Sequence, residues 1–289
     1  MSDAIETIAD TARWVAWYRA LESDRPDAWF RDPFARRLAG ERGERIARGM
    51  AFANKNAWSY VARTVLIDRF ISEKVAQGAD MVVNLAAGLD TRPYRMELPP
   101  RLQWIEVDLP ELLAYKAGVL AGEAPVCRLE RVPLDLTDAR ARSNLFTEMN
   151  RRANNVIVVT EGLIGYLTAQ DVAGLAEDLA CQPNFKWWTL DIVSPRLLRM
   201  LQASIGATLD AGGAPLKFAP EEGPAFFARH RWKPTEVRPL LKTAATLRRL
   251  PFGLRLLALL PDSAGRKPQR PWAGVCLLAR DNIKLGLGR

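Results

Sequence analysis

Short apolar runs alternate with longer segments of helical periodicity through the middle of this chain. The runs that read as buried strands cover residues 81–85, 102–107, 127–134, 156–159 and 185–193. Segments with helical spacing lie between them at residues 110–121, 138–152 and 169–180. This alternation predicts an α/β protein with a mostly parallel sheet and helices on both of its faces.

Three helical patterns precede the first strand. They cover residues 5–21, 33–48 and 56–77, and the third carries apolar positions that can face a sheet. We therefore expect residues 1–78 to form an N-terminal helical cap that leads into the core.

The last third of the chain is less regular. Residues 196–230 are interrupted by glycines and prolines and predict an insertion that covers the site as a lid. Residues 231–239 and 273–280 predict a final pair of strands, with a helix at 254–260 between them. The complete pattern predicts seven strands in a single domain that spans residues 1–289.

Composition narrows the possible partners. The chain has 289 residues, 48% of them hydrophobic and 26% charged, which is typical of a globular protein. Its net charge of +8 would suit nucleic acid, an anionic substrate or a membrane surface. The arginines are dispersed, however, and the densest basic patch also contains Glu41 and Glu44. We therefore expect no nucleic-acid partner.

The cysteines and the apolar segments indicate the cellular compartment in which the protein is expected. Cys127, Cys181 and Cys276 are far apart and odd in number, so they predict neither a metal site nor a disulfide framework. The N-terminus is acidic and lacks an apolar signal region. No apolar run approaches the roughly 18 to 20 residues that span a bilayer. These features predict a cytoplasmic protein without a membrane partner.

The stretch from Asp80 to Glu111 indicates a nucleotide site. A strand runs into a turn at Gly88, and the next strand ends on Asp108, twenty positions later. A dinucleotide site has more glycines, and its pyrophosphate would be repelled by Asp90. S-adenosylmethionine carries a sulfonium cation and an ammonium group, so an acidic turn suits it better. A nicotinamide-dependent oxidoreductase stays open as the alternative.

Acidic side chains follow four of the predicted strands. They are Asp90, Asp108, Asp135 and Glu161. Because ligands of parallel α/β sheets bind at the carboxyl ends of the strands, we expect these four side chains to share one site. Glu161 follows a fully apolar strand, where an unpartnered carboxylate would be costly to bury.

Several motifs in the right order resemble one family. The segments that carry the resemblance are Asn84-Leu85-Ala86-Ala87-Gly88-Leu89-Asp90-Thr91-Arg92-Pro93-Tyr94-Arg95, Glu106-Val107-Asp108-Leu109-Pro110-Glu111, Pro133-Leu134-Asp135-Leu136 and Thr160-Glu161-Gly162-Leu163-Ile164-Gly165-Tyr166-Leu167. They closely resemble the leucine carboxyl methyltransferase family, which uses S-adenosylmethionine and includes bacterial polyketide O-methyltransferases. The resemblance covers roughly residues 11–193 and is weak beyond 195. It implies a class I, Rossmann-like methyltransferase fold and an O-methyltransferase acting on a small molecule.

The resemblance also implies a set of site residues. Those expected to bind the cofactor are Arg63, Ala86, Gly88, Asp90, Asp108, Leu109, Asp135, Leu136, Glu161 and Gly162. In this set Arg63 would pair with the carboxylate of S-adenosylmethionine, Asp108 would take its ribose hydroxyls, and Glu161 would face its ammonium group. Asp135 and the backbone at Leu136 would read the adenine edge.

Some of these residues also have structural interpretations. Asp90 can form an ion pair with Arg92 and shape the loop, and Asp135 can be a turn residue. Tyr166, which the resemblance implies to lie near the methyl group or the substrate, is our candidate catalytic residue, with core packing as its alternative. Asp138 is interpreted as a helix cap.

The identity of the methyl acceptor stays open. A carboxylate is ionised at neutral pH and needs no general base, whereas a phenol, with a pKa of about 10, would benefit from one. His230, the single histidine, lies outside the matched motifs, which favours a carboxylate. Arg196, Arg199 and Arg229 are candidates for steering such an anion. A peptide C-terminus is the alternative acceptor, because one branch of the family methylates a protein carboxylate.

Overall fold

A computed structural model describes residues 5–50 and 54–281 of the chain. Its centre is one sheet of seven strands in the order β3-β2-β1-β4-β5-β7-β6. The strands are β1 (Met81–Leu85), β2 (Gln103–Asp108), β3 (Arg128–Pro133), β4 (Val156–Thr160), β5 (Phe185–Val193), β6 (Trp232–Pro239) and β7 (Ala273–Arg280). The pairs among β1 to β5 are parallel, and β7 runs antiparallel to both of its neighbours. The predicted seven-stranded, mostly parallel α/β fold is confirmed.

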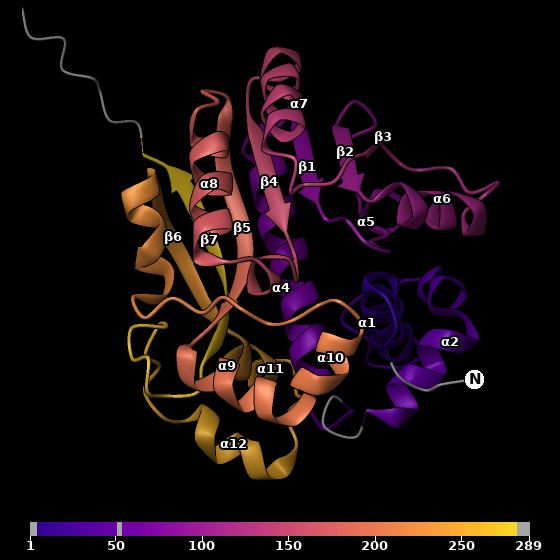
Figure 1. The fold of residues 1–289 in the computed structure, drawn as a ribbon. Coiled ribbons are helices and arrows are strands. Elements are labelled where there is room, and N and C mark those ends of the chain that lie inside the picture. The colour runs from indigo at the N-terminus through magenta and orange to yellow at the C-terminus, as the bar shows by residue number, and fades with distance from the viewer. Residues whose placement is uncertain (1–4, 51–53, 282–289) are drawn as a thin grey trace, which may run out of the picture.

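Helices cover both faces of this sheet (Figure 1). One face packs against α7 (Ala139–Arg152) and α8 (Ala169–Ala180), and the other against α4 (Ala57–Ala76) and α11 (Leu240–Thr246). The central strands β1 and β4 are buried at every residue, which explains their continuous apolar sequences. The sequence pattern did not predict α11.

A third apolar cluster lies beside the sheet. It joins α1 (Ile8–Ser23) and α2 (Ala35–Gly49) to α6 (Pro110–Val119) and to α10 (Ala207–Ala211) through side chains such as Trp14. Among the N-terminal helices, α4 belongs to the core of the sheet, because Leu66 and Phe70 pack against strand residues. Among α1, α2 and α4, the first two lie outside the layers that flank the sheet.

The segment predicted as a lid contains several short helical elements. Helix α9 (Pro195–Leu201) continues through the π-helical turn η2 (Gln202–Gly206) into α10, and the 3₁₀-helix η3 (Gly223–His230) follows after a loop. The chain then returns to the sheet as β6, and α12 (Phe252–Ala258) precedes the last strand. The remaining short elements are α5 (Arg92–Arg95) and the 3₁₀-turn η1 (Ile164–Tyr166).

Two further observations concern the cysteines and membrane-spanning segments. Cys127, Cys181 and Cys276 are all free thiols. Among the residues that the structure describes, no helix combines the length and the apolar character that crossing a membrane requires.

A fully buried ion pair joins β2 to α6. The Lys116 ammonium lies 2.7 Å from Glu106 Oε1, and neither side chain is exposed. Arg131 on β3 reaches the second carboxylate oxygen at 3.1 Å. The pair thus fixes α6 against the two strands that precede and follow it, and it positions the loop after Asp108.

We predict that Glu106→Ala lowers the free energy of unfolding by about 3–5 kcal/mol, because Lys116 would stay buried without its counterion. Glu130→Ala is the matched control on β3: this carboxylate is exposed and pairs with Arg152 at 2.6 Å, so its loss should cost less than about 1 kcal/mol. Urea unfolding measures both. If both variants lost the same free energy of unfolding, the conclusion that the buried Glu106–Lys116 pair stabilises the fold would be contradicted.

Candidate active site

One cavity of about 540 Å³ lies at the carboxyl ends of β1, β2, β4 and β5. This volume is within the range of about 300–1,000 Å³ that is usual for small-molecule sites. Its walls include all eleven residues predicted from the sequence: Arg63, Ala86, Gly88, Asp90, Asp108, Leu109, Asp135, Leu136, Glu161, Gly162 and Tyr166. The parallel strands bring them together, because their carboxyl ends meet at one edge of the sheet.

The glycine turn after β1 is held by Asp108. Gly88 and Ala86 both have a φ of 53°, in the left-handed region that favours glycine. The Gly88 amide donates to Asp108 Oδ2 at 2.6 Å, and the Leu109 amide donates to Oδ1 at 2.7 Å. Burial raises the pKa of Asp108, although these two hydrogen bonds counteract the rise. Each oxygen keeps a lone pair with which to accept a further hydrogen bond.

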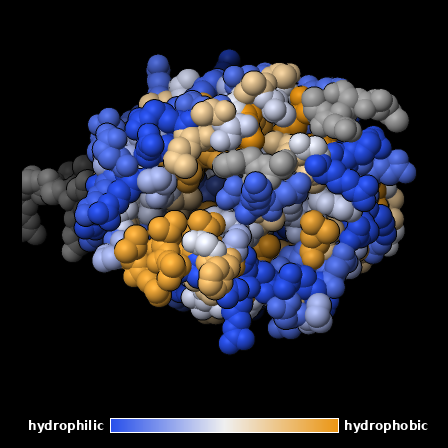
Figure 2. Space-filling view, turned by 90° about the horizontal axis from the view of Figure 1, so that it is seen from below, coloured by the Kyte–Doolittle hydropathy of each residue, from blue (hydrophilic) through white to orange (hydrophobic). Residues whose placement is uncertain are grey.

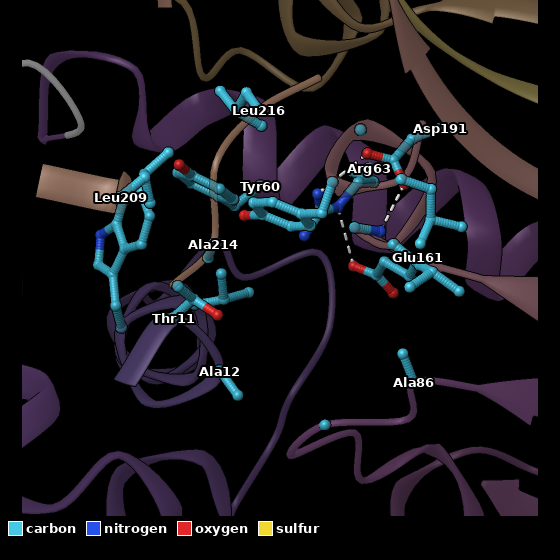
Figure 3. A pocket seen from close by; sticks show the side chains of 18 of the residues that line it. Thr11, Ala12, Tyr60, Arg63, Ala86, Glu161, Asp191, Leu209, Ala214 and Leu216 are labelled. Atoms are coloured by element: carbon cyan, nitrogen blue, oxygen red, sulfur yellow. Dashed lines mark hydrogen bonds and ion pairs between the residues drawn. The ribbon is translucent and has the colours of Figure 1, made fainter. Parts of the chain in front are cut away.

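Arg63 of α4 lies between two acids at the end of the sheet (Figure 3). Its Nε is 3.0 Å from Glu161 Oε1 and its Nη1 is 3.1 Å from Asp191 Oδ2. Asp191 also accepts a hydrogen bond of 2.7 Å from the Gly162 amide. The turn after β4 is therefore linked to β5 and to α4 through this one group of side chains.

Behind the cavity, Arg92 joins three carboxylates. The guanidinium is 2% exposed and lies 2.6 Å from Asp68 Oδ1, 2.8 Å from Asp90 Oδ2 and 2.8 Å from Glu161 Oε2. Asn84 donates to Asp90 at 2.8 Å from the end of β1. The structural pairing of Arg92 with Asp90 that the sequence suggested is thus confirmed.

These contacts set the charge states of the acids. Burial acts to raise the pKa of Asp68, Asp90 and Glu161, but the neighbouring guanidinium groups outweigh it. All three pKa values are therefore lowered, and the carboxylates stay ionised. The direction of each pKa change follows from the charges, because each carboxylate faces at least one buried cation that stabilises its ionised form.

Two tyrosines line the cavity near Arg63. Burial raises the pKa of both Tyr60 and Tyr166 above the usual value, so their hydroxyl groups are neutral. The Tyr60 ring is stacked on Tyr18 with a centroid separation of 5.0 Å. A neutral phenol can donate a hydrogen bond to an oxygen in the cavity, but it cannot act as a base.

Asp135 is a turn residue that also lines the cavity. Its Oδ1 accepts from the Thr137 amide at 2.9 Å and from the Thr137 hydroxyl at 2.8 Å, which defines a side-chain turn. These bonds lower the pKa of its exposed carboxyl group. Asp135 and Leu136 nevertheless line the cavity beside the end of β3. Asp138 caps α7 by accepting from the Ala141 amide at 2.9 Å, as predicted.

The other end of the cavity is apolar. Its side chains come from α9, η2, α10 and the loop after them: Leu197, Leu198, Leu201, Ile205, Leu209, Leu216 and Phe218. Figure 3 shows Leu209 and Leu216 away from the group formed by Arg63, Glu161 and Asp191. Helix α1 contributes Thr11, Ala12 and Trp14 to the same wall. The segment predicted as a lid thus lies against the cavity; its movement as a lid stays a prediction.

Charge is distributed unevenly around the cavity. Its described lining contains five carboxylates, Asp90, Asp108, Asp135, Glu161 and Asp191, and three cationic side chains, Arg19, Arg63 and Lys217. Arg19 pairs with Asp32 at 2.9 Å, so its charge is compensated. Asp90, Glu161 and Asp191 are likewise paired with Arg92 or Arg63. Within the described residues, Asp108 and Asp135 have no cation in an ion pair, and their charge favours a ligand with positive charge over a pyrophosphate.

Several candidates from the sequence lie elsewhere. His230 is 3.0 Å from Glu177 and does not line the cavity, so it is not placed to act as a base there. Arg196, Arg199 and Arg229, which were considered for steering an anion, are likewise absent from the described lining of the cavity. Helix α9, which carries Arg196 and Arg199, presents Leu197, Leu198 and Leu201 to the cavity.

Asp191 and Tyr60 were not predicted. Asp191 lies inside a strand that also contains Lys186 and Thr189, whereas Glu161 directly follows a strand, so Asp191 has no comparable signal in the sequence. Tyr60 precedes Arg63 by three residues, and positions three apart lie on the same face of a helix. Tyr60 could therefore have been found from a residue already considered.

Comparisons with known proteins identify the family. Residues 12–180 match the model of the leucine carboxyl methyltransferase family. A relative from Frankia alni, named as a candidate S-adenosyl-L-methionine-dependent methyltransferase, is 32% identical over 268 residues, which are 84% of this chain and 91% of the relative. The chain belongs to the leucine carboxyl methyltransferase family, and the resemblance inferred from its motifs is confirmed.

Solved structures support the fold. A protein of the DUF574 family from Streptomyces avermitilis superposes with a TM-score of 0.61 at 14% identity, covering 94% of this chain and 97% of its own. A candidate methyltransferase from Thermobifida fusca gives a TM-score of 0.61 at 15% identity, covering 96% and 95%. The class I methyltransferase fold predicted from the sequence is thereby confirmed.

We predict that Arg92→Gln destabilises the protein by about 3–5 kcal/mol at pH 7, because three buried carboxylates lose their common cation. In the wild type the lowered pKa values make stability fall below about pH 4, where the unfolded chain takes up protons first. In the variant the carboxylates would take up protons more readily in the folded state. The difference in the free energy of unfolding between wild type and Arg92→Gln should therefore become smaller as the pH falls.

Urea unfolding between pH 4 and 8 checks this prediction. Arg69→Gln is the matched control on α4, because Arg69 is exposed and pairs with Glu73 at 2.6 Å. The Arg69→Gln variant should lose less than about 1 kcal/mol of unfolding free energy at every pH. A deficit in Arg92→Gln that does not change with pH would contradict the proposed charge network.

Proposed function

We propose that this protein is an O-methyltransferase that transfers a methyl group from S-adenosylmethionine to an oxygen of a small molecule in the cytoplasm. Family membership makes it a methyltransferase that depends on this cofactor. The choice of oxygen, of a carboxylate acceptor and of a polyketide-like or other secondary metabolite is the proposal. The observation that carries it is one cavity with an acidic end at the strand termini and an apolar end beneath α9 and α10.

The acidic end fits the cofactor. Asp108 presents two oxygens, already oriented by the amides of Gly88 and Leu109, that can accept hydrogen bonds from the two ribose hydroxyls. Glu161 and Asp191 supply negative charge for an ammonium group, and Arg63 between them supplies the guanidinium for a carboxylate. Asp135 and Leu136 at the end of β3 would contact the adenine.

The apolar end supports an acceptor with an apolar body. Seven leucine, isoleucine and phenylalanine side chains of the segment 197–218 surround it. S-adenosylmethionine supplies an electrophilic methyl group on a sulfonium. The protein then has to hold an acceptor oxygen in line with that methyl group and to exclude water, and such orientation can lower the barrier by several kcal/mol.

The described lining favours an acceptor that is already ionised. It contains no histidine, its tyrosines are neutral, and Glu161, Asp90 and Asp191 are engaged by arginines or by Gly162. A carboxylate needs no proton removed before it attacks. Tyr166, our candidate catalytic residue, would donate a hydrogen bond that orients the acceptor oxygen.

Cofactor binding can be tested at Asp108. We expect Asp108→Asn to weaken binding of S-adenosylmethionine and of its demethylated product by about 10- to 100-fold, since hydrogen bonds to a charged group contribute about 1.5–3 kcal/mol. Asp138→Asn is the control, because Asp138 caps α7 outside the cavity. Isothermal calorimetry measures both variants. Undiminished affinity in Asp108→Asn would remove the proposed ribose contact.

The acceptor can be identified by a matched screen. We expect methyl transfer to apolar carboxylic acids, with a kcat/KM that stays constant from about pH 6 to 9 because the acceptor is ionised throughout. A phenol acceptor would instead give a kcat/KM that rises with pH. Peptides ending in a free carboxylate are the third arm of the screen. Release of demethylated cofactor is the measurement, and transfer to phenols alone would overturn the carboxylate proposal.

A further inference from the structure

The surface around α12 is unusually apolar. Phe252 is 83% exposed, Leu256 71% and Leu259 79%, and Leu257 and Leu260 are also exposed. Figure 2 views the molecule from the α12 end and shows apolar side chains gathered there in one patch, with hydrophilic residues at its margin. Contiguous exposed patches of this kind mark sites of interaction.

Exposed cations accompany this patch. They are Arg248, Arg255, Arg266, Lys267 and Arg270. Within the described part of the chain none of the five forms an ion pair, whereas Arg249 beside them pairs with Glu22 and Asp27. The single acid between residues 247 and 272 is Asp262, which accepts from the Trp272 indole and the Ala264 amide. The patch therefore combines exposed apolar groups with uncompensated positive charge.

A second cavity lies beside the patch. It has a volume of about 260 Å³ and is lined by Ala245, Arg248, Leu250 and Arg255. Two guanidinium groups without a carboxylate partner thus converge on one hollow with an apolar wall. Arginine forks of this kind match the geometry of a phosphate.

The turn that carries Arg248 is fixed in place. Arg248 has a φ of 56° in the left-handed region, at the end of α11, where glycine would be favoured. Arg249 anchors the turn to the end of α1 through Glu22 at 2.9 Å, and the Trp29 indole donates to the Leu247 carbonyl at 2.9 Å.

We propose that α12 and these cations form a docking surface for a membrane that contains anionic phospholipids. Phe252, Leu256 and Leu259 enter the boundary between headgroups and acyl chains, while Arg248 and Arg255 bind a lipid phosphate in the small cavity. The sequence predicted no membrane partner because no segment can span a bilayer, but a surface contact requires no span. Helix α9, which lines the apolar end of the active-site cavity, lies at the same end of the molecule as α12 (Figure 1).

The experiment is cosedimentation of the full chain with vesicles. One set consists of phosphatidylcholine and the other of phosphatidylcholine with phosphatidylglycerol. The surface variants are F252S/L256S/L259S and R248E/R255E. The control is R140E/R151E, which makes the same charge change at two exposed positions of α7 at the opposite end of the molecule. Circular dichroism and S-adenosylmethionine binding verify that each variant is folded.

We expect wild type and control to bind the anionic vesicles at least tenfold more tightly than either surface variant does, and to bind neutral vesicles weakly. Equal binding by wild type and the serine variant would overturn the proposal. So would a wild-type dimer that the serine variant dissociates, since a second copy would then cover the patch. Binding of inorganic phosphate that R248E/R255E abolishes, without any vesicle binding, would also overturn it in favour of a free anion.

Discussion

The candidate active site depends on one buried guanidinium group. Arg92 follows the glycine turn and reaches Asp68 on α4, Asp90 in the turn and Glu161 at the end of β4. A lysine could not replace it, because a single ammonium cannot present several fixed donors to three carboxylates at once. The arrangement couples a helix and two strand ends that are distant in the sequence. It also keeps the acids ionised, although burial acts to raise their pKa values.

This network explains how an acidic cavity can be stable before any cation enters it. Carboxylates gathered at the ends of parallel strands would repel one another and would lose hydration. Arg92 compensates them from behind, and Arg63 does so from the side of the cavity by reaching Glu161 and Asp191. Because Asp108 and Asp135 have amide or hydroxyl partners instead of cations, their negative charge is not neutralised by an ion pair. The cavity therefore retains an acidic character that suits a positively charged cofactor.

Much of this arrangement could be predicted from the sequence, since it depends on local patterns. The strands and the acids that follow them have clear signals, and parallel topology then places the acids at one edge of the sheet. The sequence did not single out Asp191, because this residue lies within a predicted strand and not after its end. Helix α11 was missed because it directly follows the residues of β6 without a break.

The apolar end of the cavity could not be predicted in this way. It is formed by α9, η2, α10 and the loop after them, and α9 carries Arg196 and Arg199, which suggested an anion site. Which face of each helix turns inward is decided by packing: Leu209 joins the cluster of Trp14 and Leu38 and turns that stretch of the helix toward α1. Leucines of α9 and α10 line the cavity, and Arg196 and Arg199 are absent from its described lining. The segment that we propose to contact the acceptor follows residues 12–180, which the family model matches. Under the proposed function, acceptor choice can therefore change through α9 and α10 while the strand-end acids, and with them the proposed cofactor site, stay the same.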